Sequence, residues 1–385
     1  MNHFLKQYLG KIMKVPFCIE MDGEKEYVGE GAPEFTVKIN KPLSKSELLK
    51  STSLALGEAY MRKDIEVDRD LYEVLNLFLG HMDGFQTDHH ALKSLLYTSD
   101  SKKNQKKEVA SHYDIGNDFY RLWLDDTMSY SCAYFKEESD TLYEAQMHKI
   151  EHILEKLRLE EGMTLLDIGC GWGALLKEAA IRYKVKGMGI TLSKEQHDKF
   201  QEDIEKEGLT DYLSVKLLDY RELPKLGMVF DRVVSVGMME HIGRGHYELF
   251  LETIDQVLKE KGLCLLHYIS ALKEHPGDAW IKKYIFPGGV IPSLREIIYL
   301  LPEYRFYVLD VESLRRDYNR TLLCWRKNFL EVREQVVASM GEEFARMWEV
   351  YLSSCAATFY NGIVDLHQIL FSKGCNNDIP LHRVV

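Results

Sequence analysis

Apolar residues come in two kinds of run over the part of the chain that follows Ser111. Short, nearly continuous runs are typical of strands buried in a parallel sheet, and they alternate with stretches whose apolar positions recur at helical spacing. The predicted strands cover 164–168, 185–190, 213–218, 230–236 and 262–269, and the predicted helices cover 175–183, 194–207 and 247–260. This alternation predicts an α/β fold, a doubly wound parallel sheet with helices on both faces.

The first 98 residues have a mixed pattern. Apolar positions between Phe4 and Ile12 recur at helical spacing, residues 35–39 alternate like a strand, and residues 71–79 read as a helix with an apolar face. The N-terminal helix, which carries lysines between its apolar positions, either lies on a membrane surface or packs on its own domain.

A polar run separates these two patterns. Residues 99–107 contain four lysines and no apolar residue, so they are either a solvated loop or a contact for lipid phosphates. We therefore predict a smaller accessory, lipid-related domain over 1–98, a linker over 99–108 and a catalytic domain over 109–385.

Charge and cysteine content exclude several classes of protein. A net charge of -11 disfavours nucleic-acid binding, which depends on neutralising phosphates, and restricts any membrane contact to a local patch. The seven cysteines form no Cys-x-x-Cys pair, which favours free thiols over disulfides or a metal site. No run approaches the roughly 20 apolar residues of a membrane-spanning helix, and no signal peptide is recognisable. We expect a cytoplasmic protein.

Three glycines follow the first strand of the predicted sheet. Gly169, Gly171 and Gly173 come shortly after the acidic Asp167, and glycine permits both a tight turn and close approach of a ligand. Ligands of open α/β sheets bind at the carboxyl ends of the strands. The spacing differs from the G-x-G-x-x-G of dinucleotide-binding loops and is similar to the first motif of Rossmann-like methyltransferases. A glycine turn without a ligand is the alternative.

Longer motifs resemble the family of cyclopropane synthases and mycolic-acid methyltransferases. They follow one another in the family's order, at 112–120, 123–125, 128–135, 189–196, 239–243, 266–269, 284–289 and 317–322. A weaker likeness at 56–61 favours the bacterial phospholipid enzymes, because the mycolic-acid enzymes are shorter at this end.

The resemblance implies a Rossmann-like class I methyltransferase that uses S-adenosylmethionine. Its substrate would be an unsaturated membrane phospholipid, whose cis double bond receives a methylene bridge. It further implies peripheral association with the inner face of the membrane, and it leaves a homodimer open.

The resemblance also implies a cofactor site. Gln196 stands where many such enzymes have an acidic residue for the ribose, and Asp219 and Tyr220 would lie near the adenine. The cofactor-binding residues carried over are Tyr130, Ser131, Asp167, Gly169, Gly171, Trp172, Gly173, Thr191, Leu192, Gln196, Asp219 and Tyr220.

A bicarbonate ion near the transferred methyl group is a second implied ligand. It would accept the proton that must leave before the ring closes. Its implied ligands are Cys132, Glu240, His267, the backbone of Ile269, and Tyr318. Cys355 is a further family position, either catalytic or simply a buried thiol.

Plainer interpretations stay open for several of these residues. Glu240 can be a helix cap, and His267 can be a histidine satisfied within the core. Residues 280–286 combine aromatic, aliphatic and basic side chains, and they either contact lipid or pack into the core. Two other functions also remain: a methyltransferase for another acceptor, such as an amine, and a non-catalytic lipid-binding protein.

Overall fold

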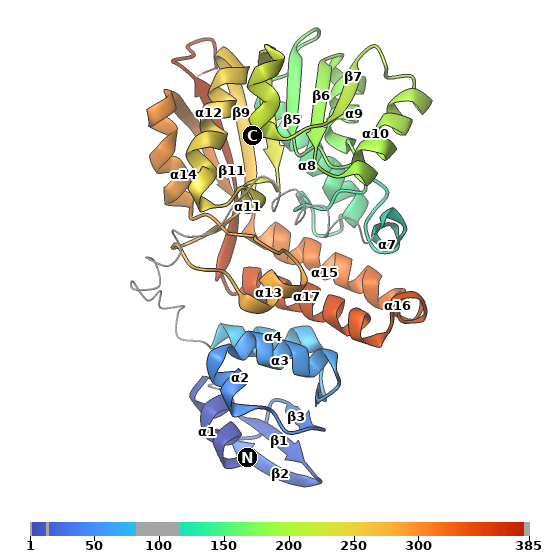
Figure 1. Ribbon diagram of the computed structural model, residues 1–385, viewed down its shortest axis with the longest axis vertical. Coiled ribbons are helices and arrows are strands. Elements are labelled where there is room, and N and C mark those ends of the chain that lie inside the picture. The colour runs from blue at the N-terminus through green and yellow to red at the C-terminus, as the bar shows by residue number, and fades with distance from the viewer. Residues whose placement is uncertain (1, 13–14, 82–115, 381–385) are drawn as a thin grey trace. The chain divides into compact units, whose positions relative to one another are not determined.

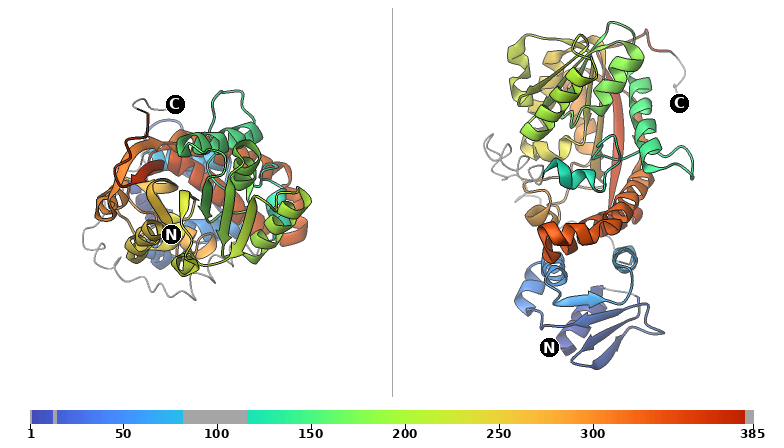
Figure 2. Two further views of the ribbon diagram at one scale, coloured as in Figure 1. Left: turned by 90° about the horizontal axis from the view of Figure 1, so that it is seen from above. Right: turned by 90° about the vertical axis from the view of Figure 1, so that its right-hand side faces the viewer.

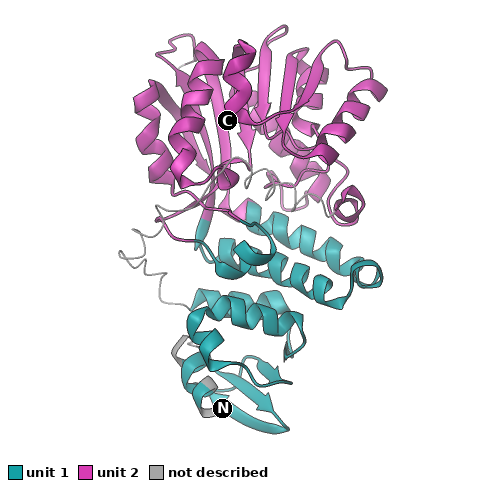
Figure 3. Cartoon of the chain, in the orientation of Figure 1, with its two compact units in different colours: residues 1–88, 277–287, 318–364 teal, residues 89–276, 288–317, 365–385 magenta. Residues whose placement is uncertain are grey.

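The computed structural model describes residues 2–12, 15–81 and 116–380, which fall into two compact units. One unit comprises 1–88, 277–287 and 318–364, and the other comprises 89–276, 288–317 and 365–385 (Figure 3). The division into segments 1–98, 99–108 and 109–385 stays a prediction, because residues 82–115 lie outside the described part. Among the described helices, none has the length and apolar character needed to cross a membrane.

The first unit contains a four-stranded sheet in the order β2-β1-β3-β4. Its strands are β1 (Phe17–Met21), β2 (Glu24–Val28), β3 (Thr36–Ile39) and β4 (Ile65–Val67). β1 and β2 form a hairpin whose turn residues, Asp22 and Gly23, both have positive φ, as a tight two-residue hairpin requires.

Helices from three parts of the chain complete this unit. They are α1 (Asn2–Ile12), α2 (Lys45–Lys50), α3 (Thr52–Met61), α4 (Leu71–Gly80), α13 (Ala279–Tyr284), α15 (Arg315–Glu331, from residue 318), α16 (Arg333–Met340) and α17 (Glu342–Tyr360). Leu9 of α1 is buried in the core of the unit, which agrees with a helix packed on its own domain. α17 packs on α3 and α4, and buried Arg346 donates hydrogen bonds to the carbonyl groups of Tyr60 and Ile65.

Residues 280–286 belong to this unit, and two of their apolar side chains pack inward. Trp280 and Ile285 are buried, and Glu58 accepts hydrogen bonds from Lys283 and from the Tyr284 hydroxyl group. The membrane-contact interpretation of this segment is therefore wrong for its main aromatic residue, since the indole of Trp280 lies against Gly57 of α3.

The second unit contains a seven-stranded sheet in the order β10-β11-β9-β8-β5-β6-β7 (Figure 1). Its strands are β5 (Thr164–Ile168), β6 (Lys186–Thr191), β7 (Leu213–Leu217), β8 (Phe230–Val236), β9 (Leu258–Ala271), β10 (Phe306–Ser313) and β11 (Val364–Lys373). β5 pairs in parallel with β6 and β8, and β8 pairs in parallel with β9. The predicted Rossmann-like α/β fold is confirmed.

Helices cover both faces of this sheet (Figure 2). The helical segments of the unit are α7 (Asn117–Arg121), α8 (Leu142–Leu157), α9 (Ala174–Tyr183), α10 (Lys194–Lys206), η1 (Tyr220–Leu226), α11 (Met239–Ile242), η2 (Arg244–His246), α12 (Tyr247–Val257), α14 (Leu294–Leu300) and η3 (Leu301–Tyr304). Successive strand residues point to opposite faces, so Leu165 packs with α8, α9 and α10, whereas Leu166 packs with α12 and α14.

The end of one predicted helix is wrong. The helix predicted over 247–260 stops at Val257, because Leu258 adopts an extended conformation and pairs with Phe230 of β8. The antiparallel pair β10–β11 was not predicted from the sequence.

Candidate functional site: a cofactor pocket beside a buried polar cluster

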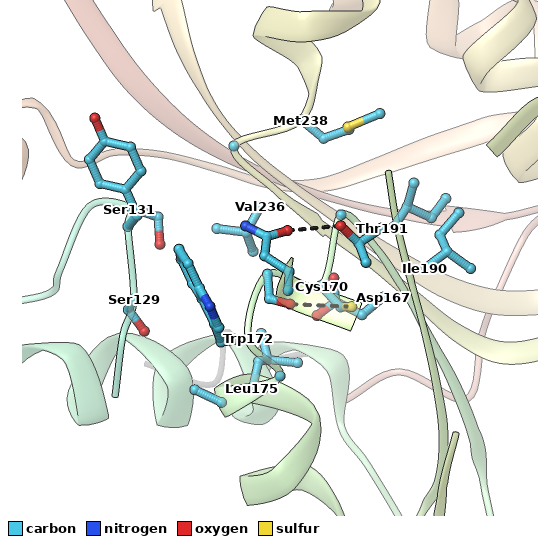
Figure 4. Close-up of a pocket in the computed structure, with 18 of the residues that line it drawn as sticks. Ser129, Ser131, Asp167, Cys170, Trp172, Leu175, Ile190, Thr191, Val236 and Met238 are labelled. Carbon is cyan, nitrogen blue, oxygen red and sulfur yellow. Dashed lines mark hydrogen bonds between the residues drawn. The ribbon is translucent and has the colours of Figure 1, made fainter. Parts of the chain in front are cut away.

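A pocket opens at the carboxyl ends of β5, β6 and β8 in the second unit. Residues from several separate segments converge on it, and Figure 4 shows four of them: the loop with Ser129 and Ser131, the loop with Cys170 and Trp172, the end of β6 at Thr191, and the loop with Met238. Of the twelve predicted cofactor-binding residues, all except Asp219 line this pocket.

The glycine loop has two distinct requirements for glycine. Gly169, Gly171 and Gly173 all have positive φ, so the turn itself favours glycine. A Cβ at Gly171 would meet no other atom within 4 Å, whereas a Cβ at Gly173 would lie 2.2 Å from the ring of Phe200 on α10. A Cβ at Gly171, which lines the pocket, would thus enter open space, whereas the missing Cβ at Gly173 allows α9 and α10 to approach each other.

The end of β6 brings two polar side chains together. The hydroxyl group of Thr191 donates a hydrogen bond of 2.8 Å to Gln196 Oε1, and both residues are buried (Figure 4). Asp219 instead accepts hydrogen bonds from the backbone and the guanidinium group of Arg221. Tyr220, the next residue, does line the pocket.

Two buried charged residues, Asp167 and Lys149, line the same pocket and interact electrostatically. Burial raises the pKa of Asp167 to about 7, with the charge of Lys149 opposing that rise, and Asp167 Oδ1 has no hydrogen-bond partner in the described structure. Burial lowers the pKa of Lys149 to about 8, and its ammonium group donates a 3.0 Å hydrogen bond to Ser131 Oγ. Sequence reasoning missed Lys149.

A second polar group of residues lies where β8 and β9 end. Glu240 Oε1 accepts a 2.6 Å hydrogen bond from the backbone N–H of Ile269, while Glu240 Oε2 is buried without a partner among the described residues. Burial raises the pKa of Glu240 to about 7. His267 lies two residues before Ile269 on β9 and pairs with Val236, which lines the pocket. The same face of β9 therefore presents His267 and Ile269 beside the pocket.

His267 is buried and asymmetric in its contacts. Its Nδ1 lies 3.2 Å from the amide nitrogen of Gln368, and its Nε2 has no partner in the described structure. Burial, with a further contribution from nearby Lys149, holds the pKa of His267 well below its usual value. The imidazole is therefore neutral at physiological pH.

The remaining predicted catalytic residues lie in different surroundings. The buried thiol of Cys132 donates to the carbonyl groups of Ala133 and Leu314. Tyr318 belongs to the first unit and packs against Phe359 and Trp325. Cys355 belongs to that unit too, and burial raises the pKa of its thiol to about 12, so the nucleophilic thiolate is disfavoured. These site assignments stay predictions.

Comparison with known proteins decides the family. Residues 100–369 match the family described as mycolic acid cyclopropane synthetase, and residues 4–90 match a domain of unknown function, DUF7884. The chain belongs to the cyclopropane synthetase family. The resemblance inferred from the motifs is thereby confirmed, and so is the expectation of an S-adenosylmethionine-dependent methyltransferase.

Relatives match either nearly all of the chain or its larger part. A probable fatty acid methyltransferase of Pseudomonas putida is 38% identical over 94% of this chain and 93% of its own length. Cyclopropane-fatty-acyl-phospholipid synthase of Escherichia coli K12 is 38% identical over 92% of both chains.

The solved structure of the cyclopropane synthase MmaA2 from Mycobacterium tuberculosis is also similar. It is 35% identical, covers 70% of this chain and 98% of its own, and superposes with a TM-score of 0.66. A second structure, mycolic acid cyclopropane synthase CmaA1 with SAH and CTAB, is 36% identical, covers the same shares and has the same TM-score.

Proposed function

We propose that this enzyme uses S-adenosylmethionine to add a methylene bridge across the cis double bond of an unsaturated phospholipid acyl chain. One observation carries the proposal: Glu240 Oε2 and His267 Nε2 are buried, have no partner among the described residues, and lie where β8 and β9 end beside the cofactor pocket. An amine nitrogen attacks the methyl group through its own lone pair, whereas cyclopropane formation requires a proton to leave the transferred carbon itself, which needs an acceptor held beside the cofactor. The near full-length likeness to a phospholipid enzyme supports a phospholipid over a mycolic acid.

The pocket suits S-adenosylmethionine, which supplies an electrophilic methyl group when bound. Lys149 and Asp167 are opposite in charge, as are the carboxylate and the ammonium group of an amino acid. We assign Lys149 to the carboxylate and Asp167 to the amine. Gln196, whose Oε1 already accepts from Thr191, keeps its amide donors for the ribose hydroxyl groups.

The polar cluster suits bicarbonate, which supplies a proton acceptor when bound. A neutral imidazole can donate one hydrogen bond from Nε2. Because the pKa of Glu240 is about 7, its carboxyl group can be protonated and can approach an anion without repulsion. We assign Glu240 and His267 to this ligand, with Tyr318 and Cys132 as family-implied members.

In this reaction, positioning of the reactants and exclusion of water matter more than covalent catalysis by the protein. The π electrons form a bond to the transferred carbon while its bond to sulfur breaks, and the ring closes when one proton leaves that carbon. The chain must hold the alkene in line and exclude water, which would trap the cationic substrate. An aromatic ring such as that of Tyr130, which lines the pocket, can stabilise a cation without attacking it. We further propose that the enzyme works as a peripheral protein at the cytoplasmic face of the membrane.

Mass spectrometry tests this function directly. Purified protein is incubated with S-adenosylmethionine and vesicles of a monounsaturated phospholipid, and vesicles of the matching saturated phospholipid serve as control. We expect a gain of one CH₂ only in the unsaturated lipid, in a product that resists hydrogenation as a cyclopropane does. Transfer to an amine headgroup, or no transfer at all, would refute the proposal.

A further inference from the structure

Helix α8 buries a row of polar side chains instead of exposing it. Gln146, Lys149, His152 and Lys156 follow at intervals of three and four residues, which places them on one face, and all four are buried. Gln146 donates a 2.9 Å hydrogen bond to the carbonyl group of Ser131 in the pocket loop. Buried polar groups carry a free-energy cost unless they are bonded, so this row calls for an explanation.

Lys156 lies between two carboxylates and an amide. It forms a 3.0 Å ion pair with Asp310, a second ion pair with Glu312, and a 2.9 Å hydrogen bond from Nζ to Gln368 Oε1. His152 bonds to Glu312 as well, at 2.7 Å. An ammonium group can only donate, so Lys156 requires the oxygen of the Gln368 amide to face it.

The orientation of the Gln368 amide determines which of its atoms faces His267. With Oε1 of Gln368 turned to Lys156, the amide nitrogen faces His267 Nδ1 at 3.2 Å. The amide nitrogen can only donate, so Nδ1 must accept and cannot carry a proton. The opposite amide orientation would bring donor against donor at Lys156. The single proton of the neutral ring is then left on Nε2, the atom without a partner in the described structure.

We propose that Lys156 and Gln368 are positioning residues that hold His267 as the tautomer protonated on Nε2. Lys156 of α8, acting through Gln368, thus makes His267 Nε2 a hydrogen-bond donor, not an acceptor, for a ligand beside the cofactor pocket. A ligand rich in acceptor oxygens, such as an oxyanion, fits this donor. The use of the donor in ring formation rests on the proposed function, whereas the tautomer itself does not. Carboxylates and amides that orient a working histidine in this way are common around metal and catalytic sites.

The tautomer can be measured without substrate. Protein labelled with ¹⁵N-histidine is examined by NMR at neutral pH, and the His267 signals are identified by their loss in His267→Gln. We expect a protonated Nε2 and an unprotonated Nδ1 in the parent protein. Gln368→Glu keeps the size and the contact with Lys156 but offers an acceptor to Nδ1, so Nδ1 should become protonated. Turnover should fall roughly 100-fold, as for other residues that orient a working side chain, with unchanged S-adenosylhomocysteine binding.

Two outcomes overturn the proposal. A proton on Nδ1 of His267 in the parent protein contradicts it without any variant, and so does an unprotonated Nδ1 in a folded Gln368→Glu protein. Gln256→Glu, the same change at an exposed position on α12, should leave both the tautomer and the turnover as in the parent. A correct tautomer in a protein that fails to convert unsaturated vesicles would support this inference and refute only the proposed function.

Discussion

Glu240 and Ile269 are joined by a 2.6 Å hydrogen bond from the backbone N–H of Ile269 to Glu240 Oε1. The bond ties the short helix α11 to β9 and leaves the second carboxylate oxygen directed into a buried site.

We expect Glu240→Gln to keep the bond through its amide oxygen while losing the titrating group. Turnover should then fall by about 10² to 10⁴, because a carboxyl group with a pKa of about 7 can take on the proton that bicarbonate first accepts, whereas an amide cannot. Turnover assays and calorimetry with S-adenosylhomocysteine check this, and Glu248→Gln, an exposed change on α12, is the control. Near-parental turnover would refute the assignment.

Gly171→Val should abolish cofactor binding. The φ of Gly171 is +56°, and a Cβ there enters open space on the pocket side, so a branched side chain adds both backbone strain and an obstruction. Gly208→Val is the matched control, because Gly208 also has a positive φ and open surroundings but lies outside the pocket. Calorimetry should show lost binding for the first variant only. Equal losses in both would mean that strain alone is responsible.

Lys149→Met should weaken binding of S-adenosylhomocysteine but not of 5′-methylthioadenosine, which lacks the amino-acid portion. The reason is the proposed pairing of the Lys149 ammonium group with the ligand carboxylate. Since the pKa of Lys149 is about 8, this contribution should be present below pH 8 and fade above it in the parent protein. Lys206→Met, an exposed change on α10, is the control in both titrations. Equal weakening for the two ligands would contradict the assignment.

Asp167→Asn should stabilise the ligand-free protein at pH 8 more than at pH 4. The folded-state pKa of Asp167, about 7, exceeds the ordinary 3.8, so the folded state binds the extra proton and stability falls as pH rises between these values. The asparagine variant loses this decline, and its advantage over the parent should grow by at most about 4 kcal/mol across that interval. Urea unfolding at both pH values measures it, with exposed Asp211→Asn as control. A pH-independent difference would rule out the shifted titration.

Gly57→Ala should destabilise the first unit, although alanine ordinarily favours a helix by about 1 kcal/mol over glycine. The new Cβ would lie 2.4 Å from the Trp280 ring, and overpacking of this kind costs about 1–3 kcal/mol. Thermal unfolding of this variant should therefore begin earlier than that of the parent. Gly245→Ala, where a Cβ meets nothing within 4 Å, should not show the loss.

The central sheet could be predicted because its strands are short and almost wholly apolar. β5 and β8 begin and end where the sequence pattern places them. β11 was not predicted, because its apolar run is interrupted by His367 and Gln368, polar residues that the pattern assigns to a surface. Gln368 is buried only because Lys156 and His267, both more than 100 positions away, supply its partners.

The cofactor pocket could likewise be read from glycines and motifs, while its buried lysine could not. Lysines on an amphipathic helix normally indicate the exposed face. The available signal was the spacing of Gln146, Lys149, His152 and Lys156, which repeats like a row of core residues in a helix. No local rule says whether such a row faces solvent or interior, because that depends on carboxylates supplied by β10.

The first unit is assembled from chain segments that are made at very different times. During synthesis its sheet and α1 to α4 emerge from the ribosome long before α17, whose Arg346 bonds to the carbonyl groups of Tyr60 and Ile65. Arg346 lies 286 and 281 positions after these two partners, so the nascent N-terminal portion remains for some time with part of its eventual interior uncovered. Contacts of such long sequence separation form slowly. Chains that terminate before α17 should accordingly be clients of chaperones and proteases.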